Sequence, residues 1–176
     1  MEKKILVVLY SYTGTGKTLA QLLTSQQGWP MGHVSEAKPR KGVWGTWRCL
    51  LDSWLRRRPE VHYVGPSPNE FDCVVLVFPI WMYRLAGPMR SFVVSHQKLL
   101  PDLAVISLMG KRGGHNAVAE IESLVGRSPL LTTVFTAAEV QNGSYAGRLQ
   151  AFGDAIEQAE NSQEVTRPSM WSMPTL

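Results

Sequence analysis

Four apolar runs, rich in β-branched residues, alternate along this chain with stretches of helical periodicity. The runs span residues 5–10, 73–78, 103–108 and 131–137. Continuous apolar strands are typical of a parallel sheet covered on both faces, because both sets of side chains are then buried. Helical spacing is found in residues 17–27, 43–57, 89–95, 116–125 and 144–159. This alternation predicts an α/β fold, an open, doubly wound sheet with helices on both faces.

Turn-forming and polar residues set the expected boundaries of these elements. Pro79 is expected to end the strand before it, because proline has no N–H to donate to a sheet. Asn116 is expected to cap the helix that it begins. A short edge strand is expected around residues 33–34. From residue 161 the chain is polar and broken by proline, so we expect one domain over residues 1–160 and a C-terminal tail over residues 161–176.

Length and composition fit a globular protein. The chain has 176 residues, of which 44% are hydrophobic and 18% charged, and these values exclude a disordered chain. No apolar run approaches the roughly 20 residues that a membrane-spanning helix needs, and the N-terminus lacks the features of a secretory leader. Cys49 and Cys73 are too few for a disulfide framework, and the histidines show no metal-ligand spacing. We therefore expect a cytoplasmic protein with no transmembrane segment and no metal.

The positive charge of the chain is concentrated in one segment. Lysine and arginine number 18 against 14 acidic residues, and the net charge is +4. Residues 38–58 hold seven of the basic residues and only one acidic residue, Asp52. This surplus predicts an anionic partner rather than general affinity for nucleic acid. The helix expected over residues 43–57 also carries an apolar stripe. That stripe could pack on the sheet, form a homodimer seam or a lid, or dock on an acidic protein or anionic membrane surface.

Three loops follow strand ends and carry unusual residues. They span residues 11–18, 79–84 and 110–115. In open α/β sheets, ligands bind outside the carboxyl ends of the strands, so these loops are the candidates for a binding site.

The first loop has the features of a phosphate-binding turn. It reads Ser11, Tyr12, Thr13, Gly14, Thr15, Gly16. Its glycines permit a tight turn, its hydroxyls can donate hydrogen bonds, and the following helix presents its N-terminal amides. Gly16, Lys17 and Thr18 match the end of a nucleoside triphosphate P-loop. That motif, however, requires a glycine where Ser11 stands, and an acidic residue at the end of a neighbouring strand, which is missing after residues 73–78. A triphosphatase is therefore disfavoured.

Taken in order, the three loops resemble those of the flavodoxin-like flavoproteins. Ser11, Thr13, Gly14 and Ala20 match the first block of that family, although Gly16 stands where the family usually has threonine. Residues 71–81, which end in Pro79, Ile80 and Trp81, resemble the second block, and Arg84, Pro88 and Phe92 continue it. Residues 109–114 resemble the third, glycine-rich block. The resemblance covers most of residues 3–158. It implies a five-stranded parallel sheet and non-covalent binding of FMN.

The resemblance also assigns roles to the second and third loops. Trp81, Met82 and Tyr83 would lie at the flat, apolar flavin ring; the alternative is that Trp81 is ordinary core and Tyr83 ordinary surface. The glycines Gly110, Gly113 and Gly114 would bring backbone amides to the polar edge of the ring. Arg112 and His115 could stabilise an anionic flavin, bind a nicotinamide phosphate, or face solvent. The implied cofactor contacts are Ser11, Tyr12, Thr13, Gly14, Thr15, Gly16, Pro79, Ile80, Trp81, Met82, Tyr83, Gly110, Arg112, Gly113 and Gly114.

Three functions are compatible with these residues. The first is an oxidoreductase that uses NAD(P)H to reduce a small acceptor such as a quinone. The second is an electron carrier that docks on a redox partner protein. The third is a binding module of the same fold that has lost FMN, which the glycine at position 16 keeps open. Electron-carrier flavodoxins are typically acidic, whereas this chain has a pI of about 9.2, and the reductase is therefore favoured.

Overall fold

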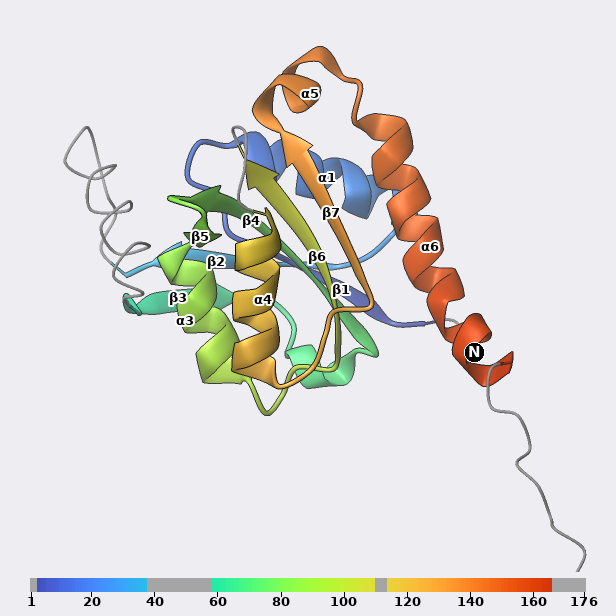
Figure 1. Ribbon diagram of the computed structural model, residues 1–176, viewed down its shortest axis with the longest axis horizontal. Coiled ribbons are helices and arrows are strands. Elements are labelled where there is room, and N and C mark those ends of the chain that lie inside the picture. The colour runs from blue at the N-terminus through green and yellow to red at the C-terminus, as the bar shows by residue number, and fades with distance from the viewer. Residues whose placement is uncertain (1–2, 38–57, 110–113, 166–176) are drawn as a thin grey trace, which may run out of the picture.

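The structure is a computed structural model, and it describes residues 3–37, 58–109 and 114–165. Its centre is a sheet with five parallel strands (Figure 1). Across the sheet their order is β2 (Met31–Glu36), β1 (Ile5–Leu9), β4 (Cys73–Trp81), β6 (Asp102–Met109) and β7 (Leu131–Thr136). Counting only these parallel strands, the order is 2-1-3-4-5, which is the flavodoxin-like order of a doubly wound sheet. The predicted fold class and the five parallel strands are thus confirmed.

Two short antiparallel strands extend this sheet and were not predicted. Strand β3 (Val61–Val64) pairs with β2 at the edge, and β5 (Arg84–Leu85) pairs with the end of β4. Both are too short to show a periodic pattern in the sequence. A turn of 3₁₀ helix, η1 (Pro68–Glu70), follows β3.

The expectation that Pro79 ends β4 is wrong, because the strand continues to Trp81. The Val77 carbonyl accepts a hydrogen bond from Tyr10 on the β1 side. Backbone groups two residues apart in a strand point to the same side, so the nitrogen of Pro79 also faces the β1 side. Strand β1 has already ended at this level of the sheet. A missing N–H therefore costs no ladder bond at Pro79, and the other edge of β4 stays paired with β6 as far as Leu108.

Within the described residues, helices cover both faces of the sheet (Figure 1). Helices α1 (Thr15–Gln27) and α6 (Ala146–Val165) pack on one face, against Ile5, Val7 and Leu9 of β1. Helices α3 (Gly87–His96) and α4 (Gly114–Val125) pack on the other, against the alternate residues of the same strands. Each central strand is therefore buried on both sides, which explains its continuous apolar sequence.

Some helix boundaries differ from those predicted. Helix α4 begins at Gly114 rather than Asn116, and α6 begins at Ala146 and ends at Val165, five residues inside the predicted tail. A short helix, α5 (Ala137–Asn142), was missed; it begins with a capping box formed by Thr136 and Glu139. The helix expected over residues 43–57, and the tail from residue 166, lie outside the described residues. No helix in the described part of the chain is long and apolar enough to cross a membrane.

Candidate functional site

The first two of the three loops meet at one edge of the sheet. Leu9, the last residue of β1, is paired with Val77 of β4, and Pro79 of β4 is paired with Leu108 of β6. The carboxyl ends of three adjacent strands therefore lie side by side (Figure 1). Within the third loop, Gly110, Arg112 and Gly113 lie outside the described residues. Gly114 is the first residue of α4 and is buried.

The first loop presents the N-terminus of α1 to the sheet edge. Gly14 is the N-cap of this helix, with a φ of 89°, and its N–H donates to Ser11 Oγ at 3.2 Å. No described side chain caps the helix. Because the first amides of an α-helix have no partner within the helix, those of α1 remain as donors for an anionic group.

The surroundings of Gly14 leave room for such a group. A Cβ at Gly14 would have no described atom within 4 Å. Thr13 and Thr15 are the chain neighbours of Gly14, and their hydroxyls lie 3.4 Å apart. The uncapped amides and the two hydroxyls are hydrogen-bond donors of the kind that a phosphate requires, and the open space can accommodate it. The residues present therefore fit a phosphate group.

Gly16 has a different environment. A Cβ there would lie 3.2 Å from Ser11 Oγ and 3.3 Å from Ser11 Cβ, closer than most Cβ contacts, and at an ordinary contact distance of 3.4 Å from Leu108 Cδ1. Gly16 is buried, so the first turn of α1 approaches both the loop and β6 closely. A side chain at this position, such as the threonine usual in the resembling family, would require Ser11 to shift by a few tenths of an ångström. The glycine at this position is thus explained by packing.

The second loop is a tight hairpin between β4 and β5. Trp81 is paired with Arg84, so Met82 and Tyr83 form a two-residue turn. Their φ angles are 49° and 61°, the left-handed values of a type I′ turn, which asparagine and glycine favour. Each non-glycine residue held there costs about 1–3 kcal/mol, and such strain is concentrated at functional sites. Both side chains are large and apolar yet about half exposed, which makes this turn a candidate contact surface.

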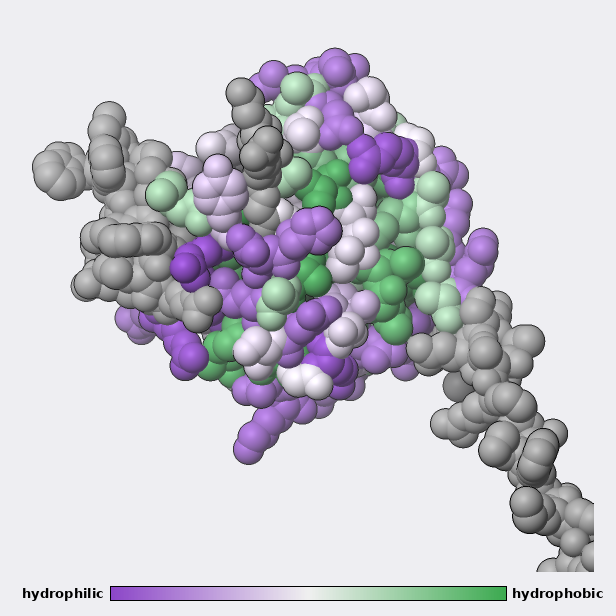
Figure 2. Space-filling view, in the orientation of Figure 1, coloured by the Kyte–Doolittle hydropathy of each residue, from purple (hydrophilic) through white to green (hydrophobic). Residues whose placement is uncertain are grey.

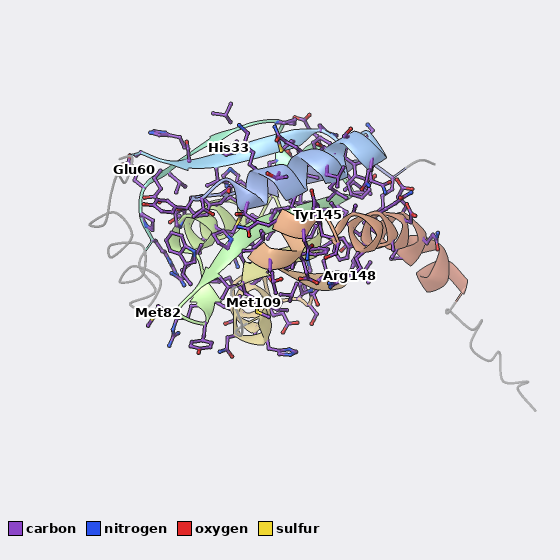
Figure 3. All side chains as sticks on the ribbon, turned by 90° about the horizontal axis from the view of Figure 1, so that it is seen from above. His33, Glu60, Met82, Met109, Tyr145 and Arg148 are labelled. Atoms are coloured by element: carbon purple, nitrogen blue, oxygen red, sulfur yellow. The ribbon has the colours of Figure 1, made fainter. Side chains whose placement is uncertain are left out.

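An aromatic contact joins the first and second loops. The rings of Tyr12 and Trp81 meet edge to face, with centroids 5.3 Å apart and planes at 87°. Trp81 is half-buried and is therefore not an ordinary core residue. Ile80, by contrast, belongs to the core on the α3 and α4 side, and Pro79 is half-buried. Met82 lies at the periphery of the molecule, at the tip of the hairpin (Figure 3).

Two polar residues of β2 reach the same region and were not predicted. His33 lies beside Leu9 in the parallel register and close to α1 (Figure 3). Burial lowers the pKa of His33, and the positive charge of Lys17 lowers it further. Glu36 accepts a hydrogen bond from Tyr10 Oη at 2.8 Å. These neighbours follow from the register in which β2 pairs with β1. The sequence of β2 has too few apolar residues to fix that register, so the neighbours could not be predicted.

Comparison with known proteins identifies the fold. No protein-family model matches the chain, and no curated protein matches it in sequence. Among solved structures, it is similar to a flavoprotein from Lactobacillus acidophilus NCFM crystallised in complex with FMN, with a TM-score of 0.66 and 18% identity over 81% of this chain and 99% of the other. A WrbA-like flavodoxin from Agrobacterium tumefaciens gives a TM-score of 0.56 and 12% identity, covering 90% of this chain and 98% of the other. A flavodoxin from the domain Archaea gives a TM-score of 0.50 and 16% identity, covering 89% of this chain and 98% of the other. The chain therefore has a flavodoxin-like fold.

Proposed function

We propose that this protein binds FMN non-covalently at the edge formed by its first two loops, and that it is an oxidoreductase. The observation that carries the proposal is the uncapped N-terminus of α1 behind Gly14, which lies at the same edge as the Tyr12–Trp81 pair. The first feature suits a phosphate, and the second suits a flat aromatic ring. The similarity in fold to a flavoprotein that was crystallised with FMN supports this combination.

The residues of the first loop would hold the phosphate. Thr13 and Thr15 offer hydroxyl donors, and the first turn of α1 offers backbone amides and the positive end of its dipole. Ser11 supports this turn by accepting from the Gly14 N–H. Lys17, in the first turn of the same helix, adds a positive charge to this edge. These groups need no metal ion to bind a dianion.

The second loop would hold the ring. Trp81 and Tyr12 offer aromatic surfaces at right angles, so one of them can lie along a flat ring while the other contacts its edge. Met82 and Tyr83 offer apolar surface at the exposed tip of the hairpin. When bound, FMN supplies the redox chemistry, accepting a hydride or single electrons and passing them on. The protein's part is to bind, orient and shield the cofactor.

Among flavoprotein functions, we infer a reductase that takes electrons from NAD(P)H and passes them to a small acceptor such as a quinone. A net charge of +4 and a pI of about 9.2 support this choice over an electron carrier, because carriers of this fold are typically acidic. We further propose a cytoplasmic location. The homodimer seam and the docking on an acidic partner were both expected from residues 43–57, which lie outside the described residues.

Anaerobic stopped-flow mixing of the FMN-loaded protein with NADH and with NADPH tests the reductase. Reduction of the flavin by either nucleotide within seconds, followed by reoxidation with a quinone, is the expected result. A flavin that neither nucleotide reduces, but that dithionite reduces reversibly, would instead favour the electron carrier. A folded protein that does not bind FMN would leave only the binding module.

A further inference from the structure

A second site lies between the β4–β5 hairpin and α4. It is a cavity of about 750 Å³, a size typical of small-molecule sites, and no residue of the first loop lines it. Helix α4 provides one wall through Asn116, Ala119, Ser123 and Leu124, which are spaced along one face of that helix. The hairpin provides the facing wall. Hydrophilic side chains cover much of the surface over α3 and α4 (Figure 2).

A buried ion pair between α3 and α4 forms part of the lining of this cavity. Arg90 is 2% exposed, and its Nε lies 2.5 Å from Glu120 Oε1. The same pair binds both backbone groups of Leu85, since Arg90 Nη2 donates to the Leu85 carbonyl at 2.9 Å and the Leu85 N–H donates to Glu120 Oε2 at 3.4 Å. The ion pair therefore fixes β5 in place. It also neutralises the only carboxylate among the described lining residues.

Two arginines leave the cavity with a positive charge. Arg58 and Arg84 both line it, and neither forms an ion pair with a carboxylate of the described residues. Arg84 is half-buried on β5, so the ion pair that holds β5 also holds the backbone of Arg84. Arginine binds carboxylate and phosphate groups through two parallel hydrogen bonds, and the interaction strengthens where water is partly excluded.

The rest of the lining is suited to an organic group. Met82, Tyr83 and Leu124 offer apolar and aromatic surface, while Asn116 and Ser123 can form hydrogen bonds. We propose that this cavity binds a small organic anion, with its carboxylate or phosphate on Arg58 and Arg84 and its apolar body against the hairpin and Leu124. No residue of the first loop lines the cavity, so the anion site is separate from the proposed phosphate site, although it shares Met82 and Tyr83 with the proposed ring site.

Three probes that share one apolar body test this proposal on the full-length protein. They are 2-naphthoate, 2-naphthyl phosphate and the neutral 2-naphthamide, each titrated by isothermal calorimetry. We expect at least one of the two anions to bind at least about tenfold more tightly than the amide. The two anions distinguish a carboxylate site from a phosphate site. Equal affinity for all three probes, or no binding at millimolar concentration, would overturn the proposal.

Substitutions locate the binding within the molecule. Arg84→Gln and Arg58→Gln should each weaken binding of the preferred anion several-fold, and together they should remove its advantage over the amide. Ala119→Phe should block the cavity, because Ala119 is exposed on α4 and a phenyl group there would occupy the space. Lys98→Gln removes an exposed positive charge outside the cavity and should have no effect. Anion binding that survives Ala119→Phe, or that falls equally with Lys98→Gln, would contradict the assignment. FMN affinity should be unchanged in Ala119→Phe, which separates failure of this site from failure of the flavin site.

Discussion

Tyr12 and Trp81 lie edge to face across the gap between two loops, with ring centroids 5.3 Å apart and ring planes at 87°. The first residue follows β1 and the second ends β4, so the pair exists only because those strands are neighbours in the sheet. Two perpendicular aromatic surfaces cannot both stack on one flat ring. We therefore expect one aromatic side chain to lie along the flat ring of the cofactor while the other contacts the edge of that ring.

Trp81→Ala should weaken FMN binding by at least about tenfold, or about 1.4 kcal/mol, because it removes the largest aromatic surface from the proposed ring site. It should also reduce the quenching of tryptophan fluorescence that FMN causes. Fluorescence titration measures both effects. Trp29→Phe is the control, since Trp29 is buried in the core on the α1 and α6 side and should not influence the cofactor. Normal FMN binding by Trp81→Ala would return this residue to a packing role.

Gly14→Ala should lower FMN affinity by at least about tenfold, because the new methyl group would enter the space proposed for the phosphate. Gly28→Ala is a matched control at the other end of the same helix. Gly28 also has a positive φ, 71°, and open space around a Cβ. Each substitution should destabilise the fold by about 1–2 kcal/mol through backbone strain. Chemical denaturation and FMN titration together separate strain from cofactor binding, and an equal loss of affinity in both variants would refute the phosphate site.

Replacing Met82 and Tyr83 together by Asn and Gly should stabilise the protein, by about 1–3 kcal/mol for each position, because these residues adopt left-handed angles at little cost. The same change removes apolar surface from the proposed ring site, and FMN affinity should fall. The free energy of unfolding without cofactor and the FMN dissociation constant are the two readouts. Increased stability with unchanged FMN affinity would show that the hairpin tip does not contact the flavin.

Acid should weaken the capping box that begins α5. Hydrogen bonds from the backbone and hydroxyl of Thr136, with a smaller effect of Arg148, hold the pKa of Glu139 below its ordinary value. A carboxyl with a lowered pKa in the folded state stabilises the protein above its unfolded pKa, and that contribution is lost as the pH falls through the folded pKa. Glu139→Gln should therefore lower Tm at pH 7, and its difference from the wild type should shrink below about pH 4. Glu157→Gln, at an exposed position on α6, is the control and should show no pH-dependent change in Tm relative to the wild type. If the Tm difference between Glu139→Gln and the wild type is the same at every pH, this account is contradicted.

The sequence predicts β1, β4, β6 and β7 well because each is a continuous apolar run. Strand β2 was expected only as a short edge strand around residues 33–34, and in the structure β3 lies outside it. The sequence also predicts that the first loop is a tight turn, because two glycines stand between a buried strand and a helix. Strand β5 and the strained hairpin could not be foreseen, because two residues carry no period and Met82 and Tyr83 are poor residues for that turn. The cavity beside the hairpin was also missed. Its arginines come from segments far apart in sequence, and only tertiary packing brings Arg58 and Arg84 together.

The most direct test of the central claim is a comparison of FMN with riboflavin, which lacks the phosphate, by calorimetric titration of the cofactor-free protein. The proposed site predicts stoichiometric binding of FMN and an affinity at least about tenfold higher for FMN than for riboflavin. It also predicts that flavin co-purifies with the protein and is visible by its absorption bands. A folded protein that binds neither compound, or that binds both equally, would contradict the assignment of the first loop as a phosphate site.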